Sequence, residues 1–343
     1  MKAWVINKIT EVSEGNPPLV LTDIPVPEPG PGQVRIRISV CGICHTELDE
    51  IEGRTPPPHL PVIPGHQVVG RIDAAGKGAN RWKPGDRVGV AWIFSACGKC
   101  NYCLSSQENL CEEFSATGRD HNGGYTEYMV VDENFCFGIP EAITDKKAAP
   151  LFCAGAIGYR SLNLAGMENR KSLGLSGFGA SAHLVLKLLT FKYPEIKVYV
   201  FARRDAEKDF ARQLGAVWTG DYHETPPEKL DAIIDTTPAW KPIVKSLECL
   251  KPGGRLVINA IRKQSGDQHL LSKIRYHDHL WMEKEIKSVA NVTRRDVSEF
   301  LELAAESGIS PETQDYTFSE ANRALIDMKE GRIRGAKILN IPE

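Results

Sequence analysis

The chain has 343 residues, of which 42% are hydrophobic and 25% are charged, and its formal net charge is −2. This length suggests two domains, and the near-neutral charge argues against nucleic acid or an anionic membrane as a partner. The sequence has no run of about 18 apolar residues and no secretory signal pattern at its N-terminus, so we expect a cytoplasmic protein without a membrane span.

The first half of the chain reads as short β-strands separated by glycine and proline. Gln33 to Val40 (QVRIRISV) alternates polar and apolar residues, as a half-buried strand does. Residues 66–76 and 86–92 have a similar pattern, and turns are expected at 30–32 and 83–86. We therefore expect residues 1–153 to form a mostly β, barrel-like domain.

Three residues of this half could bind one metal ion. Cys44 lies in CGICHTEL, His66 in PGHQVVG and Cys153 in APLFCAGAIGY, each close to glycine. Together they offer two thiolates and one imidazole, which leaves one of the four positions of Zn²⁺ open and balances its charge. A lone cysteine or histidine is more often an ordinary core residue, so this assignment depends on the rest of the sequence.

Four of the nine cysteines fall within fifteen residues, with the spacing C-x2-C-x2-C-x7-C. In a long chain without an export signal, a reducing compartment favours metal binding over disulfides. The short spacers let one turn aim successive thiolates at one point, which predicts a structural zinc in a lobe over residues 95–113. Its ligands are Cys97, Cys100, Cys103 and Cys111. An iron–sulfur cluster and unligated thiols are the alternatives.

From about residue 155 the sequence alternates between strand and helix patterns. Strands are expected near residues 172–176, 197–202, 231–236 and 253–260, and helices near 180–191, 205–215 and 241–250. This alternation predicts a doubly wound parallel sheet over residues 154–290. Two further helical segments and a last strand in residues 291–343 are expected to return to the first domain.

The segment GLSGFG, residues 174–179, follows the first of these strands and opens a helix. Small residues there let the backbone approach a pyrophosphate at the helix N-terminus. Ser176 replaces the second glycine of the usual G-x-G-x-x-G motif, so the signal depends on its βαβ context. The predicted coenzyme-binding turn consists of Gly174, Ser176, Gly177, Phe178 and Gly179. The alternative is a tight strand–helix turn without a ligand.

The end of the next strand, VYVFARRDAEK, bears on the choice of coenzyme. An NAD-binding fold should have Asp or Glu there to hold the ribose hydroxyls. Counting back from LGA places Ala202 at that position, followed by Arg203 and Arg204. Two guanidinium groups suit a 2′-phosphate, so we expect NADP(H) to be preferred while NAD(H) stays possible. A solvated run of charges is the alternative.

Together these motifs resemble the zinc-dependent medium-chain alcohol dehydrogenases, especially the branch named for cinnamyl alcohol dehydrogenases. The resemblance covers nearly the whole chain and rests on CGICHTEL, PGHQVVG, GDRVGV, the cysteine lobe, GGYTEYM, LFCAGAIGYRSL, the nucleotide turn and EGRIRGAKIL. It implies a GroES-like catalytic domain, a Rossmann coenzyme domain and two Zn²⁺ per chain. The catalytic zinc would be held by Cys44, His66 and Cys153.

The resemblance also implies roles for neighbouring residues. Thr46 would lie beside the substrate oxygen and accept its proton, His45 would face the coenzyme pyrophosphate, and Trp92 would line an apolar pocket. Gln67 is a departure, because many relatives have glutamate directly after the histidine ligand. Glu47 stands where aspartate is common and would orient the imidazole ring of the histidine ligand.

The expected function is that of an alcohol dehydrogenase or aldehyde reductase, which transfers hydride between a primary aliphatic or aromatic alcohol and NADP(H). The alternatives are an NAD-dependent alcohol or polyol dehydrogenase of the same superfamily, a zinc-free quinone reductase of similar fold, and a non-enzymatic zinc-binding protein. The expected partners are a small alcohol or aldehyde and further copies of the chain, as a homodimer or homotetramer.

Overall fold

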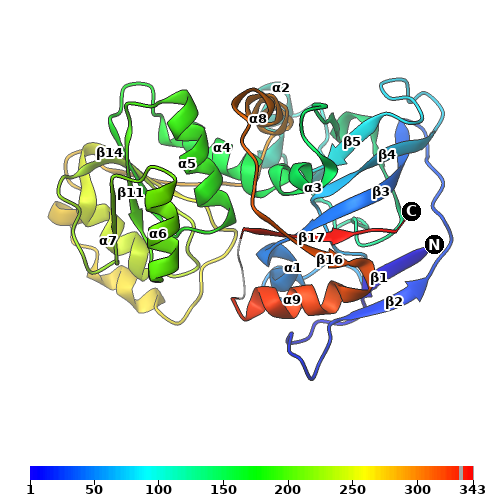
Figure 1. The fold of residues 1–343 in the computed structure, drawn as a ribbon, viewed down its shortest axis with the longest axis horizontal. Helices are drawn as coiled ribbons and strands as arrows, with labels where there is room; N and C mark the ends of the chain where they lie inside the picture. The colour runs from blue at the N-terminus through cyan, green and yellow to red at the C-terminus, as the bar shows by residue number, and fades with distance from the viewer. Residues whose placement is uncertain (332–334, 343) are drawn as a thin grey trace. The chain divides into compact units, whose positions relative to one another are not determined.

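The structure is a computed structural model that describes residues 1–331 and 335–342. Residues 332–334, which belong to the EGRIRGAKIL motif, and residue 343 lie outside the described residues. Contacts divide the chain into two compact units (Figure 1). The first comprises residues 1–156 and 291–343, and the second comprises residues 157–290.

The first unit is mostly β. Its main sheet has seven strands in the order β16-β17-β3-β4-β5-β9, with β8 also paired to β3, and only the β16–β17 pair is parallel. These strands are β3 (Gln33–Ile43), β4 (Val68–Ala75), β5 (Arg87–Val90), β8 (Tyr128–Asp132), β9 (Cys136–Gly138), β16 (Thr313–Thr317) and β17 (Ala336–Asn340). Two small sheets pair β1 (Lys2–Ile6) with β2 (Leu19–Asp23), and β6 (Ile93–Ser95) with β7 (Ser115–Ala116).

The strand β3 is central to this sheet. It pairs with β4 along one edge, while its other edge is shared by β8, at residues 33–37, and β17, at residues 40–43. Gly70 of β4 lies so close to β3 that a Cβ atom there would come within 2.2 Å of the Arg37 carbonyl oxygen. The close approach holds β4 tightly against the middle of β3. The helix α1 (His45–Ile51) begins two residues after β3 ends.

The remaining helices of the first unit connect or cover its sheet. They are α2 (Asn101–Leu104), α3 (Asp145–Ala148), α8 (Arg294–Ser307) and α9 (Ala321–Lys329), with 3-10 turns η1 (Glu108–Leu110) and η3 (Ala149–Phe152), while α4 (Ala154–Ala165) runs on into the second unit. The helix α8 begins at a capping box, in which Thr293 and Asp296 each bond to the other's backbone N–H. It ends at Gly308, whose φ of 67° closes the helix.

The second unit contains one parallel sheet in the order β12-β11-β10-β13-β14-β15. Its strands are β10 (Ser172–Ser176), β11 (Lys197–Phe201), β12 (Trp218–Gly220), β13 (Leu230–Asp235), β14 (Leu250–Ile258) and β15 (Glu285–Ser288), and its helices include α5 (Ala180–Lys192), α6 (Asp205–Gln213) and α7 (Lys241–Cys249). All residues of β10 are buried, as expected for a central strand covered on both faces.

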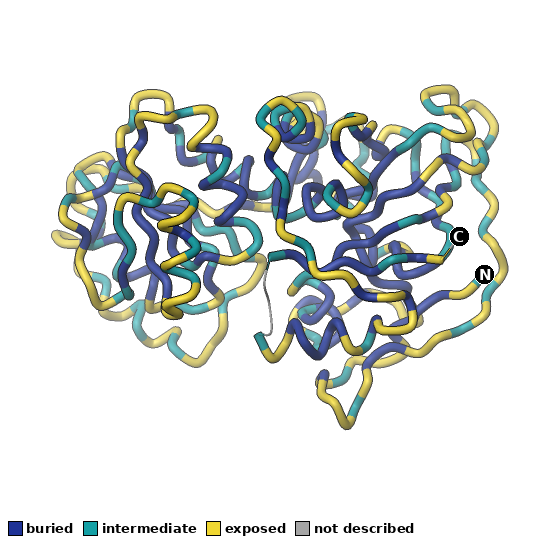
Figure 2. The backbone as a smooth tube through the Cα atoms, in the orientation of Figure 1, coloured by how far each residue is buried: buried dark blue, intermediate teal, exposed yellow. Residues whose placement is uncertain are grey.

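The expected fold, a mostly β unit combined with a doubly wound parallel sheet, is therefore confirmed. Figure 2 shows buried strands in each unit and exposed connecting loops. Among the described residues, no helix is both long enough and apolar enough to cross a bilayer.

Candidate metal centres and coenzyme site

The structure brings Cys44, His66 and Cys153 together, although the first and the last are 109 positions apart in the sequence. The His66 Nε2 atom lies 3.5 Å from the Cys44 Sγ atom and 3.4 Å from the Cys153 Sγ atom. Ligand atoms about 2.0 to 2.3 Å from a tetrahedral zinc lie roughly 3.5 Å apart, so the spacing fits this ion. Three ligands leave one position of the tetrahedron open.

Local folding explains how each ligand is placed. Cys44 is the N-cap residue of α1, where its sulfur accepts a hydrogen bond from the Thr46 backbone at 3.3 Å. The Glu47 carboxylate accepts one from the Cys44 backbone N–H at 2.8 Å, which completes a capping box. His66 lies just before β4, and Cys153 directly follows η3.

Glu47 also orients the histidine. Its Oε1 atom lies 2.7 Å from His66 Nδ1, and both side chains are at most 1% exposed. This contact directs Nε2 towards the two sulfurs, as the outer partner of a metal-bound imidazole does. Burial lowers the pKa of His66, but the charges of Glu47 and Cys44 outweigh it and raise the pKa well above its usual value.

The Cys44 thiol depends on a nearby cation for its charge. A hydrogen bond with Cys153, together with burial, raises the pKa of Cys44 well above that of an ordinary thiol. Positive charge at the centre of the cluster would reverse this shift, because metal ions deprotonate the thiols that coordinate them. The set of two sulfurs and one imidazole nitrogen therefore fits Zn²⁺.

The other predicted residues of this site are Thr46, Gln67, Trp92 and His45. Thr46 is half-buried in the first turn of α1. Gln67 is 2% exposed, and its side-chain amide packs on Gly42, where an added Cβ would come within 2.7 Å of it. The Trp92 ring lies 5.5 Å from the Phe114 ring, centroid to centroid, and is half-buried. His45, the first residue of α1, is exposed.

Glu50, a fully buried acid on α1, is not among the residues predicted from the sequence. Its Oε1 atom accepts a hydrogen bond from Trp92 Nε1 at 3.5 Å, and its Oε2 atom has no hydrogen-bond partner among the described residues. Burial, followed by repulsion from Glu47, raises the pKa of Glu50 to about 8. The sequence does hold a signal for a role of Glu50 in the site: it lies four residues after Thr46, about one helical turn, which places both side chains on one face of α1.

The four-cysteine lobe forms a second cluster in the same unit. The four sulfurs all lie within 4.8 Å of one another, and the Cys97 and Cys103 sulfurs are 3.9 Å apart. A tetrahedral site of four sulfurs would place them roughly 3.8 Å apart. Backbone N–H groups of Lys99 and Cys100 lower the pKa of Cys97 to about 6, whereas burial raises the pKa of Cys103 to about 12.

The lobe is tied to the first unit through a buried carboxylate. Glu108 in η1 is 2% exposed, and its Oε1 atom accepts hydrogen bonds from Arg294 N at 2.9 Å and Arg294 Nε at 3.0 Å. Arg294 is the first residue of α8, so this contact connects the lobe to the start of that helix. The position of the lobe thus depends on the C-terminal part of the unit.

In the second unit, the predicted coenzyme turn joins β10 to α5. Gly177 has a φ of +83°, and a Cβ there would come within 2.8 Å of Thr236 Oγ1. A Cβ at Gly179, the N-cap of α5, would meet no atom within 4 Å and needs no unusual φ. The protein itself therefore does not require glycine at 179, and the open space fits a pyrophosphate at the helix N-terminus.

The other coenzyme residues are placed as follows. Phe178 is buried and packs edge-on against Phe210 of α6, with 5.8 Å between ring centroids. Arg203 and Arg204 are exposed, and they follow β11 and the buried Ala202. The first acid after them, Asp205, pairs with Lys208 at 3.3 Å.

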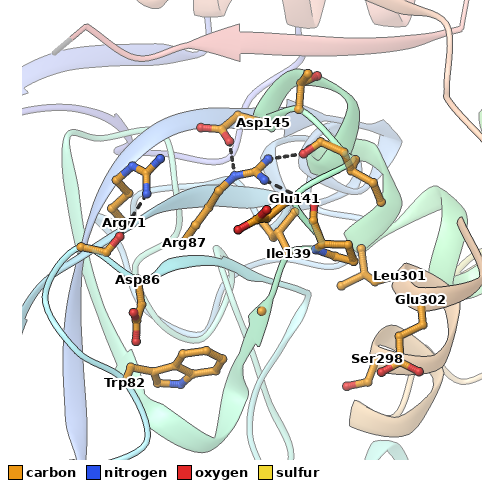
Figure 3. A pocket seen from close by; sticks show the side chains of 15 residues that line it. Arg71, Trp82, Asp86, Arg87, Ile139, Glu141, Asp145, Ser298, Leu301 and Glu302 are labelled. Carbon is orange, nitrogen blue, oxygen red and sulfur yellow. Dashed lines mark hydrogen bonds and ion pairs between the residues drawn. The ribbon is translucent and has the colours of Figure 1, made fainter. Parts of the chain in front are cut away.

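An open groove of about 1020 Å³ lies elsewhere in the first unit (Figure 3). It contains none of the predicted site residues. Arg87 crosses it and binds Asp145 at 2.6 Å, as well as the Pro140 carbonyl oxygen at 3.4 Å. These polar groups satisfy one another, so the groove is a poor candidate for the reactive site.

Known proteins similar to this chain were found by sequence and by structure. A sequence model described as "Alcohol dehydrogenase GroES-like domain" matches residues 30–141. A probable alcohol dehydrogenase, AdhA, of Mycobacterium tuberculosis (strain CDC 1551 / Oshkosh) is 38% identical over 346 residues, covering 99% of this chain and 97% of the relative.

A plant sequence and a plant structure are also similar. Cinnamyl alcohol dehydrogenase 2 of Arabidopsis thaliana is 28% identical over 321 residues, covering 89% of this chain and 83% of the relative. A solved cinnamyl alcohol dehydrogenase of Sorghum bicolor matches with a TM-score of 0.85 at 25% identity, covering 99% of this chain and 97% of the other.

Proposed function

The chain belongs to the medium-chain alcohol dehydrogenase family, and on that premise we propose that it is a zinc-dependent enzyme that interconverts a primary alcohol and its aldehyde with NADP(H). The observation that supports this most is the convergence of Cys44, His66 and Cys153, with nitrogen–sulfur distances of 3.4 and 3.5 Å. The catalytic domain would comprise residues 1–153 and 291–343, and the coenzyme domain residues 154–290.

Zn²⁺ would act as a Lewis acid that lowers the pKa of the alcohol, and the nicotinamide would carry the hydride. The protein side chains would orient these groups and move the proton. Thr46 would accept the alcohol proton at its hydroxyl oxygen, and Glu47 would keep the His66 ring aligned through the 2.7 Å contact. Trp92 would form one wall of the substrate pocket.

The preference for NADP(H) is proposed from the end of β11. Arg203 and Arg204 present two guanidinium groups, which bind phosphate oxygens well. We expect a higher kcat/KM with NADPH than with NADH, and the variant Arg203→Ser/Arg204→Ser should lower only the NADPH value. Equal use of both coenzymes by the wild-type protein would contradict the preference.

Metal dependence has a direct test. Two zinc ions per chain, measured by elemental analysis of the purified protein, would support one catalytic and one structural ion. Chelation should remove activity towards an aldehyde panel, and Zn²⁺ should restore it. One ion per chain that remains bound while activity is unaffected by chelation would contradict a catalytic zinc.

Glu50 favours a polyol as a second candidate substrate. Its carboxyl group accepts a hydrogen bond from the Trp92 indole at 3.5 Å, and its Oε2 atom has no hydrogen-bond partner among the described residues. A polar group therefore lies behind the wall that Trp92 would form. The aldehyde panel should therefore include hydroxyaldehydes beside simple aliphatic and aromatic compounds. A preference for the hydroxylated members would select this candidate.

Self-association is also proposed. The strand β15 is the edge of the parallel sheet, all four of its residues are exposed, and it has one strand partner among the described residues. An exposed sheet edge can pair with a second copy. Light scattering should show a homodimer or homotetramer, and Ile286→Lys should weaken it.

A further inference from the structure

A buried ion pair lies at the carboxyl ends of three neighbouring strands in the coenzyme unit. Asp235, the last residue of β13, is fully buried, and the Lys263 side chain, from the segment after β14, is 7% exposed. The Lys263 ammonium group contacts the Asp235 carboxylate and also donates to the carbonyl oxygens of Thr237 at 2.6 Å and Ala239 at 3.2 Å. All three ammonium protons thus have acceptors.

Two hydroxyl groups complete this network. Ser176 and Thr237 donate hydrogen bonds to Asp235 Oδ1 at 2.7 and 2.9 Å. Ser176 is the residue that replaces the second glycine of the nucleotide turn. Its side chain is therefore directed at β13. Its carbonyl oxygen also accepts hydrogen bonds from Thr236 N at 2.8 Å and Thr236 Oγ1 at 3.1 Å, which tie the turn to the segment after β13.

The network occupies the place in the sheet where the strand order reverses. The chain runs from β10 to β11 and β12 on one side, and from β13 to β14 and β15 on the other. In open parallel sheets, ligands bind beyond the carboxyl ends of the strands at this reversal. The Ser176–Asp235 bond joins the two strands on either side of it.

We propose that Ser176, Asp235 and Lys263 are positioning residues, which hold the nucleotide turn and the segment 236–240 in the arrangement that a dinucleotide requires before it binds. This inference rests on the coenzyme role proposed above. These three side chains need not contact the coenzyme, because they act by fixing the backbone of the nucleotide turn and of the segment 236–240.

The same three strands carry a matching group at their opposite ends. Ser172 Oγ donates to Asp231 Oδ2 at 2.9 Å, and Lys251 Nζ lies 3.0 Å from Asp231 Oδ1. Asp231 and Asp235 are four residues apart in β13, as are Ser172 and Ser176 in β10. An even spacing keeps the two residues of each strand on the same face of the sheet. The Ser172 group therefore repeats the chemistry of the Ser176 group, away from the ligand edge.

Burial distinguishes the two groups. The Asp231 and Lys251 side chains are 20% and 34% exposed, against 0% and 7% for Asp235 and Lys263. Burial raises the pKa of Asp235 although Lys263 opposes the shift, whereas hydrogen bonds and Lys251 together outweigh burial and lower the pKa of Asp231. Burying an ion pair costs free energy of folding, so the buried Asp235–Lys263 pair points to a role in fixing the geometry of the backbone at the carboxyl ends of the strands.

The test compares variants of the two groups by coenzyme binding and by stability. Lys263→Met should raise the Kd for NADPH, measured by nicotinamide fluorescence, by about tenfold, because the unpaired Asp235 would displace the turn. Lys251→Met, the matched control, should change this Kd less than about twofold even where it lowers the melting temperature. The double variant Asp235→Asn/Lys263→Met leaves no unpaired charge but still lacks the Lys263 contacts with the carbonyl oxygens of Thr237 and Ala239, so its Kd should remain raised. Full recovery of the affinity would overturn the positioning role of Lys263.

Hydrogen exchange in the coenzyme-free protein gives a second measurement. Amides of the turn, residues 177–180, should exchange faster in Lys263→Met than in Lys251→Met. Should Lys263→Met not fold, Ser176→Ala with Ser172→Ala as its control tests the same comparison. Equal effects of the paired variants on Kd would overturn the inference, whereas a wild-type protein that binds neither NADPH nor NADH would overturn the proposed coenzyme role itself.

Discussion

The two cysteine clusters of the first unit differ in how they are built. The four-sulfur lobe is assembled within fifteen residues, by turns whose own N–H groups lower the pKa of Cys97. The three-ligand cluster needs residues from the N-cap of α1, from the approach to β4 and from the end of η3, and its thiol Cys44 has a raised pKa. Backbone groups of a local site can lower the pKa of a ligand thiol without the ion. A site assembled from distant parts of the chain depends on the whole fold for its geometry and on the ion for the charge of a thiol such as Cys44.

The largest expected effect follows from removing a ligand of the three-ligand cluster. His66→Ala should lower kcat/KM by at least about 10³-fold, because Lewis-acid stabilisation is worth several kcal/mol. Metal content should fall from two ions to one, measured by elemental analysis. Cys136→Ser, a buried cysteine outside both clusters, is the control and should retain both ions.

The variant Thr46→Val distinguishes metal binding from catalysis. Loss of the hydroxyl should lower turnover by about 10² to 10³-fold, the usual range for a positioned proton acceptor. Both zinc ions should remain bound, because Thr46 contacts Cys44 through its backbone. Near-normal turnover would remove this hydroxyl from the proton path.

Cys100→Ser tests the contrasting role of the lobe. The variant should lose one ion and lower the melting temperature by roughly 5 °C or more, since structural zinc contributes directly to folding. Activity per folded molecule at low temperature should fall far less than in His66→Ala. A loss of activity as deep as that of His66→Ala would show that the two clusters are not separate in function.

Glu47→Gln should weaken the three-ligand cluster without removing a ligand. Outer partners of metal-bound histidines typically contribute 10- to 100-fold in metal affinity, so zinc should dissociate that much more readily in competition with a chelator. The lobe ion serves as the internal control. Unchanged affinity would mean that the 2.7 Å contact with His66 is not needed to align the ring.

The smallest expected effect is on the pH dependence of the free energy of unfolding. The pKa of Glu50 is raised to about 8, so between its unfolded pKa and this value the folded protein binds more protons than the unfolded one. The free energy of unfolding of the chelated protein should therefore decrease as pH rises, by roughly 2 kcal/mol between pH 6 and 8. Glu50→Gln should flatten this dependence in denaturant titrations. An identical slope in both proteins would contradict the shift.

Sequence patterns were sufficient for features that are local or periodic. The C-x2-C spacing, the βαβ alternation and the glycines of the turn each arise from short-range geometry, and the fold inferred from them is the one observed. The convergence of Cys44, His66 and Cys153 needed the family resemblance, because no spacing relates residues brought together by a sheet.

Two buried charged groups, Glu50 and Lys263, were not predicted from the sequence. An acid in a helix normally faces water, so Glu50 was not considered, and Lys263 lies in a segment without a periodic pattern. The sequence shows that Ser176 replaces a glycine of the nucleotide turn, but it does not show that the Ser176 hydroxyl donates a hydrogen bond to Asp235. Each of these depends on partners that only the folded chain supplies.

The strand β17 has a consequence for how the protein is made. It fills the edge of β3 at residues 40–43, directly before Cys44. During translation, about 180 residues separate the end of the unit's first segment at residue 156 from this strand. At 5 to 20 residues per second the ribosome needs roughly 10 to 35 s for that distance. The contiguous coenzyme unit can fold within this interval, so we expect the cell to load the reactive metal last.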